Sequence, residues 1–230
     1  MNFDPAEFGL IDDGSTNEVM IYNVQQGRIP ETVEVFQEVF AKYRPRGFQV
    51  VFAAVDIANH RLIWIHRYDK GFDMKDRFYL GKYPKLVHCI WSGTRYNALV
   101  ASAEESSAAS AYGSMETVPS TLASKAQSLE ELQGGPTVEL KVYEVRSGEW
   151  RAFLHSWRKI VKLRRSAGFK IEFAFADIPS RRFIWGVSLD GDFKSENTNY
   201  LNSEDRIAAN VISDFVEKFE IPKVVHIPIH

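Results

Sequence analysis

The chain contains two copies of one segment, and this internal repeat constrains its fold more than any other feature. Residues 19–80 align with residues 140–201 at a constant offset of 121 positions, without a gap and with 17 of 62 pairs identical. A repeat of this length predicts two copies of one supersecondary unit. The identical pairs include Tyr22/Tyr143, Gly27/Gly148, Gly47/Gly168, Asp56/Asp177, Arg61/Arg182, Trp64/Trp185 and Tyr79/Tyr200.

Both copies show the same order of local patterns. Each begins with a β-rich segment, 19–24 or 138–145, which stops near a glycine. A helical pattern follows and ends before a Gly-Phe pair, whose glycine suits the left-handed backbone beyond a helix. A strand, 48–56 or 169–177, then turns tightly into another, 61–68 or 182–189. We expect Asp56 and Asp177 to cap this turn through its backbone.

The copies differ after Tyr79 and Tyr200. In the second copy Ser203 is a typical helix N-cap, and apolar residues at helical spacing up to Phe219 predict a helix that Pro222 ends. Residues 224–229 are expected to form the last strand. In the first copy, residues 84–88 resemble residues 222–226 at an offset of 138, so we expect 17 residues of the second helix to be missing there.

These patterns predict an α+β protein with tandem ferredoxin-like β-α-β-β-α-β repeats, the second helix being truncated in repeat one. We expect an N-terminal tail at 1–17, the first repeat at 18–90, a Ser/Ala-rich linker at 91–136 and the second repeat at 137–230. Within it, the composition of residues 101–136 leaves two alternatives open: a flexible tether, or a helix at 122–132 that covers the sheet face left bare.

Charge and composition exclude several classes of function. The formal net charge of −2 argues against a general nucleic-acid or membrane-surface binder. No stretch approaches the roughly 18 consecutive apolar residues that a membrane-spanning helix needs, and the N-terminus lacks a signal-peptide pattern. The single cysteine, Cys89, fits a reducing compartment, so we expect a cytoplasmic protein.

Several spaced residues resemble the NIPSNAP family of the dimeric α/β-barrel superfamily. The resemblance implies that the two repeats pack their sheets into a closed barrel within one chain. Members of this superfamily include cofactor-free oxygenases, haem proteins, lyases, isomerases and binding proteins, so the fold does not select a function. The residues that carry the resemblance are Tyr22 and Tyr143 five positions before Gly27 and Gly148, the Gly-Phe pairs, and Phe193, Tyr200, Ser203 and Arg206, of which the last two have no counterpart in the first copy.

The repeated aromatic and arginine residues are the candidate ligand-binding residues. A phenol on the less apolar face of a barrel strand could reach into a cavity, and an arginine beside an indole could hold an anionic or aromatic ligand. Because these residues recur in both copies, packing explains them as well. The set, with the second copy favoured because its cover helix is intact, is Tyr143, Arg182, Trp185, Tyr200, Tyr22, Arg61 and Trp64.

The histidines and the basic cluster predict no metal or cofactor site. His88 and His226 are expected on the final strands, without the spacing of metal ligands. His66 and His155 each occur in one copy only and are the candidates for catalysis. The basic residues between 158 and 165 are expected on a solvated helix face.

Three functions follow from these features. The leading hypothesis is a protein that binds a small, partly apolar molecule in the barrel. The alternative is a cofactor-independent oxygenase or isomerase that acts on a small phenolic or polyketide-like substrate. The third is a protein-interaction scaffold that docks through residues 101–136. Sheet edges also favour pairing between chains, which leaves a homo-oligomer open.

Overall fold

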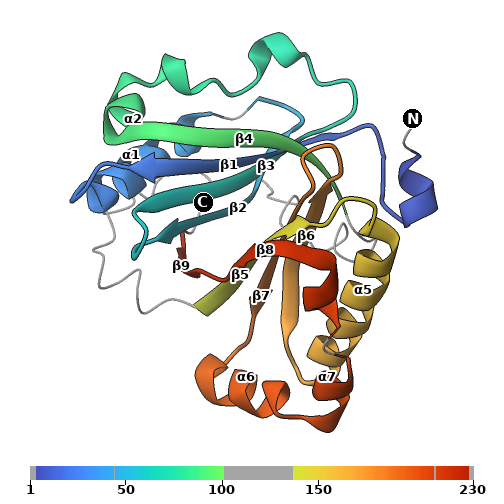
Figure 1. Ribbon diagram of the computed structural model, residues 1–230. Coiled ribbons are helices and arrows are strands. Elements are labelled where there is room, and N and C mark those ends of the chain that lie inside the picture. Colours follow the sequence, from blue (N-terminus) through green and yellow to red (C-terminus); the bar gives the residue numbers. More distant parts are fainter. Residues whose placement is uncertain (1–3, 44, 101–136, 210, 228–230) are drawn as a thin grey trace. The chain divides into compact units, whose positions relative to one another are not determined.

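The computed structural model describes residues 4–43, 45–100, 137–209 and 211–227 (Figure 1). They belong to two compact units, each containing most of one repeat. Of the described residues, the repeat 1 unit contains 13–43, 45–97 and 224–227, and the repeat 2 unit contains 4–12, 98–100, 137–209 and 211–223. Both alternatives for the linker concern residues outside the described ranges.

The repeat 1 unit is a ferredoxin-like sheet with helices. Its strands lie in the order β4-β1-β3-β2, in which β1 pairs antiparallel with β3 and β3 with β2. Two short 3-10 turns, η2 (Met74–Asp76) and η3 (Leu80–Lys82), follow β3. The main elements are β1 (Thr16–Val24), α1 (Ile29–Lys42), β2 (Phe48–Asp56), β3 (Arg61–Tyr68), α2 (Pro84–Cys89) and β4 (Ile90–Val100).

The repeat 2 unit has the same topology. Its strands lie in the order β8-β5-β7-β6, which is the same pattern shifted by one copy. The tandem ferredoxin-like α+β fold is therefore confirmed. Its elements are β5 (Thr137–Val145), α5 (Trp150–Ser166), β6 (Lys170–Asp177), β7 (Arg182–Ser188), α6 (Phe193–Leu201), α7 (Glu204–Ala208), η4 (Ile212–Phe215) and β8 (Val216–Glu220), with the N-terminal 3-10 turn η1 (Pro5–Phe8) packed on α5.

The hairpin between the second and third strands is built alike in both units. Asp56 Oδ1 accepts a hydrogen bond from the backbone N–H of Asn59 at 3.2 Å, and Asp177 Oδ1 accepts one from that of Ser180 at 3.3 Å. These bonds confirm the predicted turn caps. The glycines that precede the second strands have φ of +83° and +85°, as expected after a helix.

The predicted second helix of repeat 2, which was expected to end at Pro222, is wrong beyond Ala208. Val216–Glu220 is strand β8, which pairs antiparallel with β5. Two apolar residues assigned to the buried helix face, Ile207 and Phe219, are 62% and 65% exposed. The edge of β5 needs hydrogen-bond partners, and this segment provides them as a strand where a helix could not.

The final strands also differ from prediction. β9 (Lys223–His226) occupies the predicted place, but Val225 and His226 pair with Val55 and Ala54 of β2 in the repeat 1 unit. The repeat 1 sheet is completed instead by β4, which runs through residues 91–100 that the sequence assigned to the linker.

The segment expected to be the last strand of repeat 1 is helix α2. Pro84 stands in its first turn, where proline is tolerated, and Leu86 and Cys89 are buried. His88 therefore lies on a helix, which corrects its predicted position on a strand.

Each sheet carries its own aromatic core on the face that its first helix covers. Phe36 and Phe40 of α1 pack on Trp64, with ring centres 5.1 and 6.2 Å apart. Trp157 of α5 packs on Trp185 at 5.9 Å. Both repeated tryptophans thus face the helices of their own unit. None of the described helices has the length and hydropathy needed to span a membrane.

Candidate functional site

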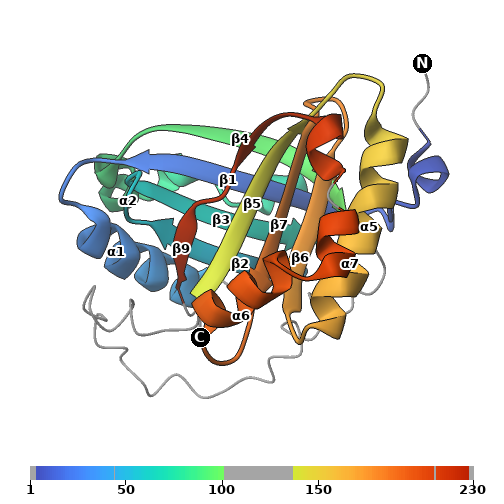
Figure 2. The same ribbon diagram turned by 60° about the horizontal axis from the view of Figure 1, so that its bottom comes forward.

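A cavity of about 220 Å³ lies within the repeat 2 unit. Its walls come from strands β5, β7 and β8 and from the helical segments α5, α6, α7 and η4. Figure 2 shows α7 beside α5, with α6 leading to it. The polar and aromatic residues of the lining are Glu139, Lys141, Tyr143, Arg164, Trp185, Asn197, Ser213, Arg206 and Phe219.

Strand alternation and helix periodicity bring the main lining residues together. Glu139, Lys141 and Tyr143 are every second residue of β5 and therefore share one face. Lys141 lies directly opposite Trp185 in the antiparallel register with β7. Arg164 lies one helical turn after Ile160, the other residue of α5 that lines the cavity, so both side chains lie on the same face of the helix.

Glu139 lies between two buried cations. Lys141 Nζ forms an ion pair with Glu139 Oε1, and Arg164 Nη2 lies 3.5 Å from the same oxygen. The side chains of Lys141 and Arg164 are only 7% and 3% exposed. Arg164 Nη1 also donates a hydrogen bond to Asn197 Oδ1 at 2.7 Å. The guanidinium is thus held from both β5 and α6.

Two guanidinium groups converge on the ring of Tyr200. The Cζ atom of Arg164 is 4.2 Å from the ring centre and that of Arg206 is 5.9 Å from it. Both distances fit cation–π contacts. Burial lowers the pKa of Arg164, and the nearby Arg206 lowers it further, whereas Glu139 opposes the shift. The positively charged guanidinium groups of Arg164 and Arg206 therefore lie close together where Arg164 is poorly solvated.

The tyrosines of the site do not balance this charge. Burial raises the pKa of Tyr143 to about 12 and also raises the pKa of Tyr200, so both phenols are neutral at neutral pH. Burial lowers the pKa of Lys141 although Glu139 favours its charged form. Among the described lining residues, Glu139 is the one carboxylate, against the three cations Lys141, Arg164 and Arg206.

The site also holds buried polar groups without a well-formed hydrogen bond. In the part of the chain that the structure describes, the indole N–H of Trp185, Nε of Arg164 and the hydroxyl of Tyr200 make no hydrogen bond of regular geometry. The hydroxyl of Tyr143 nevertheless interacts with Trp185, and that of Tyr200 interacts with Arg164 and Arg206. These polar atoms are themselves buried, although Trp185 and Arg164 contribute to the cavity lining.

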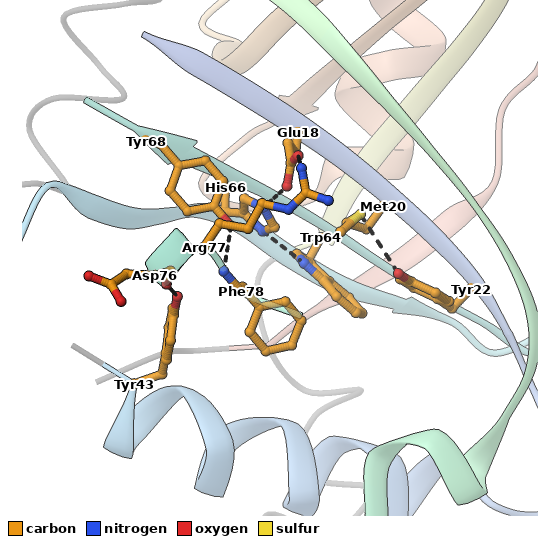
Figure 3. Close-up of polar contacts among 10 residues, drawn as sticks. All are labelled: Glu18, Met20, Tyr22, Tyr43, Trp64, His66, Tyr68, Asp76, Arg77 and Phe78. Carbon is orange, nitrogen blue, oxygen red and sulfur yellow. Dashed lines mark hydrogen bonds and ion pairs between the residues drawn. The ribbon is translucent and has the colours of Figure 1, made fainter. Parts of the chain in front are cut away.

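In repeat 1, the residues equivalent to Glu139 and Trp185 belong to a series of hydrogen bonds through Glu18, His66 and Trp64 (Figure 3). Glu18, which stands 121 positions before Glu139, has Oε2 2.7 Å from His66 Nε2. Trp64 Nε1 donates to His66 Nδ1 at 3.0 Å, which leaves Nε2 of His66 to donate to Glu18. Both Glu18 and His66 are fully buried.

The rest of the repeat 1 site is filled by side chains. The ring of Phe78 lies 5.9 Å from that of Trp64, and its backbone N–H donates to the hydroxyl of Tyr68 at 2.9 Å. Arg77 Nη1 lies 3.7 Å from Glu18 Oε1. Phe78 thus occupies the position above the tryptophan of this repeat.

The predicted site residues fall into two groups. Tyr143 and Trp185 line the cavity, and Tyr200 lies beside it under Arg164. They face the helix-covered side of their sheet, so the prediction that they line the interior of a barrel is wrong. In repeat 1, Tyr22 and Trp64 stack on each other with ring centres 4.7 Å apart.

The two repeated arginines belong to the hairpins rather than to the cavity. Arg61 Nη2 binds Asp56 Oδ2 at 2.8 Å. Arg182 opens β7, opposite Asp177 in the strand register, and is not among the described residues that line the cavity. Of the catalytic candidates, His155 is exposed on α5, whereas His66 is fully buried.

Most residues of the cavity lining were missed from the sequence, among them Arg164, Glu139 and Lys141. Arg164 was assigned to the solvated face of its helix but is 2% exposed. Its position at the end of the stripe that contains Trp157, Ile160 and Val161 was the available signal. Glu139 and Lys141 alternate with apolar residues on β5, a pattern that equally suits a solvated strand face. Among the described residues, no three His, Cys, Asp or Glu side chains are grouped so that they could hold a metal ion.

No protein-family model matches the chain, and no curated protein matches it. Solved structures match it over almost its full length. A monooxygenase-like protein from Lactobacillus acidophilus NCFM has a TM-score of 0.61 and 9% sequence identity, with 94% of this chain and 95% of that chain covered. An anthrone oxidase-like protein has a TM-score of 0.62 and 12% identity, with 95% of this chain and 94% of that chain covered.

A NIPSNAP domain protein from Burkholderia xenovorans matches only 39% of this chain, with a TM-score of 0.35 and 13% identity, and covers 92% of that protein. This likeness is too low to support a NIPSNAP assignment, which stays a prediction. The full-length matches, at 9–12% identity, show the fold alone. The chain therefore has the tandem ferredoxin-like fold of these proteins, as predicted.

Proposed function

We propose that the repeat 2 cavity binds a small phenolic or enolisable aromatic molecule as its anion, and that the protein oxygenates this anion with O₂. The observation that carries the proposal is the excess of buried positive charge beside an aromatic wall. Lys141 and Arg164 flank a single carboxylate, and Tyr143 and Trp185 supply the rings.

The cations of the cavity would favour the ionised form of the substrate. A nearby positive charge lowers the pKa of a phenol or enol, so the bound molecule loses its proton to water. Lys141 and Arg164 then stabilise the oxyanion. The resulting carbanion-like centre is electron-rich and reacts with O₂. For an aromatic ketone with a reactive ring CH₂, one oxygen atom becomes a new carbonyl and the other leaves as water, so that R₂CH₂ and O₂ give R₂C=O and H₂O.

The names of the structural neighbours support this reaction class. Two of them are monooxygenase-like proteins, the second being from Fusobacterium nucleatum with a TM-score of 0.59 and 9% identity over 95% of this chain and 94% of that chain. The third is anthrone oxidase-like. An isomerase would use the same bound anion without consuming O₂, and a NIPSNAP relationship is compatible with either reaction.

Oxygen uptake tests the proposal directly. With 1-naphthol as substrate in air-saturated buffer, the protein should consume one O₂ for each 1,4-naphthoquinone formed, with water as the second product. Arg164→Met should lower the rate by about 100-fold, because one oxyanion-stabilising group is lost. Arg165→Met, an exposed neighbour on the same helix, is the matched control and should leave the rate unchanged.

A rate no faster than that of buffer alone would refute the oxygenase. Conversion of the substrate without O₂ uptake would support the isomerase instead.

A further inference from the structure

We infer that the ligand of the repeat 2 cavity carries a carboxylate in addition to its aromatic hydroxyl, which makes it a small aromatic hydroxy acid. The inference rests on the proposed function of the same cavity and narrows its substrate class. It requires a permanent negative charge on the ligand, whereas the proposed reaction requires only a group that can ionise.

The first reason is the charge of the buried groups. Lys141 and Arg164 outnumber Glu139 by one positive charge even when Arg206 is left aside. Tyr143 cannot supply the missing negative charge at neutral pH, because burial raises its pKa to about 12. Uncompensated charge in a poorly solvated cavity is costly. A carboxylate, with a pKa of about 4, would balance it at any pH near neutral, whereas a phenol of pKa about 10 would not do so by itself.

The second reason is the geometry around Arg164. Its Nη1 donates to Asn197 and its Nη2 lies 3.5 Å from Glu139, and Arg164 is one of the residues that line the cavity. Each of these two nitrogens carries a second N–H, and a carboxylate can bind a guanidinium through two parallel hydrogen bonds. A single phenolate oxygen matches this pair of donors less well.

The third reason is the size and polarity of the cavity. A volume of about 220 Å³ would hold on the order of ten water molecules, which suits a compound of one or two fused rings. Trp185 and Tyr143 offer their rings to the ligand. Ile160 and Ile212 add apolar surface. A purely inorganic anion would leave these aromatic and apolar walls without a partner.

Calorimetric titration with three naphthalene probes tests the inference. 1-Naphthol carries the hydroxyl alone, 1-naphthoate the carboxylate alone, and 1-hydroxy-2-naphthoate both. The wild-type protein should bind 1-hydroxy-2-naphthoate at least about tenfold more tightly than 1-naphthol, because a charged hydrogen bond is added. Arg164→Gln should weaken both carboxylates by about tenfold or more and should change 1-naphthol much less. Arg165→Gln is the matched surface control.

The wild-type comparison keeps the test decisive even if Arg164→Gln fails to fold, which thermal unfolding would show. Equal affinity for 1-naphthol and the two acids would overturn the inference, and so would the absence of binding by all three probes. Unchanged carboxylate affinity in a folded Arg164→Gln protein would also overturn it. Oxygen uptake measured on the same samples separates the two proposals: carboxylate-selective binding without O₂ uptake would refute the oxygenase and leave the hydroxy-acid site standing.

Discussion

The two repeats place a buried glutamate beside a repeated tryptophan but neutralise it differently. In repeat 1, His66 bridges Glu18 and Trp64, so the carboxylate and the indole N–H are both hydrogen-bonded. Phe78 fills the space above the indole. In repeat 1, the carboxylate of Glu18 and the indole of Trp64 are thus part of a hydrogen-bonded core.

In repeat 2 the position of His66 is taken by Val187, and the position of Met20 by Lys141. Trp185 therefore lacks the imidazole acceptor that Trp64 has, and Glu139 is paired with Lys141 and Arg164. A few side-chain exchanges thus separate a hydrogen-bonded core from a cavity with an excess of positive charge. The shared backbone preserves the fold while the chemistry diverges.

Replacing His66 by valine should produce the largest effect, because it imposes the repeat 2 residue on repeat 1. Glu18 would lose the imidazole and stay buried, with Arg77 at 3.7 Å, and Trp64 would lose its acceptor. Breaking a buried pair in this way should lower the free energy of unfolding by about 3–5 kcal/mol. Urea unfolding measures the loss.

Arg151→Gln provides the control for His66→Val, because it breaks an exposed ion pair with Glu7. Its effect should stay within about 1 kcal/mol. A similarly small loss in His66→Val would mean that the repeat 1 chain does not stabilise the core.

Alkaline pH should reveal the buried phenol of repeat 2. The pKa of Tyr143 is raised by burial to about 12, against about 10 in an unfolded chain. Its contribution to stability is therefore complete below pH 10 and is lost as the pH rises from 10 towards 12, up to about 3 kcal/mol. Tyr143→Phe should remove this part of the decline in urea unfolding measured at pH 9, 10 and 11. An equally steep decline in the variant would show that Tyr143 ionises without hindrance.

Much of the fold could be predicted from the sequence because it depends on local patterns that occur twice. The glycines after the helices and the Asp56 and Asp177 turn caps follow from backbone geometry, and the gapless repeat joins them into one topology. The placement of Tyr143 in a cavity also followed from strand alternation, since it shares a face with Lys141.

The predictions were wrong where contacts between residues far apart in the sequence determine the local structure. The segment from Ile207 to Phe219 has helical spacing, yet its second half becomes a strand because β5 offers an unpaired edge. The burial of Arg164 depends on Asn197 and Glu139, which lie 33 and 25 residues away in the chain. No local pattern distinguishes such an arginine from a solvated one.

Replacing Lys141 by methionine introduces the residue that repeat 1 has at the equivalent position, Met20. The change removes one positive charge from the cavity, and Arg164 remains as the ion-pair partner of Glu139. We expect the affinity for 1-naphthoate to fall by about tenfold, equivalent to about 1.4 kcal/mol. Calorimetric titration measures it, with Lys162→Met on the exposed face of α5 as the matched control. Unchanged affinity would show that Lys141 does not contribute to ligand binding.

Replacing Val187 by histidine should have the smallest effect on stability and would rebuild the repeat 1 chain in repeat 2. Val187 lies opposite Glu139 in the strand register, just as His66 lies opposite Glu18. A new hydrogen bond to Trp185, worth about 1 kcal/mol, would be offset by the cost of adding volume to a packed site. We therefore expect a net change in the free energy of unfolding below about 1 kcal/mol.

The indole N–H resonance of Trp185 gives the sharper measurement for Val187→His, and Trp185→Phe identifies it. This resonance should move downfield and its hydrogen exchange should slow, because the N–H would gain the acceptor that Trp64 already has in His66. The other tryptophans should keep their resonances and so report that the fold is intact. An unmoved Trp185 resonance in a folded variant would mean that strand register alone does not form the chain, and that the contact of Phe78 with His66 in repeat 1 is needed to hold the imidazole in place.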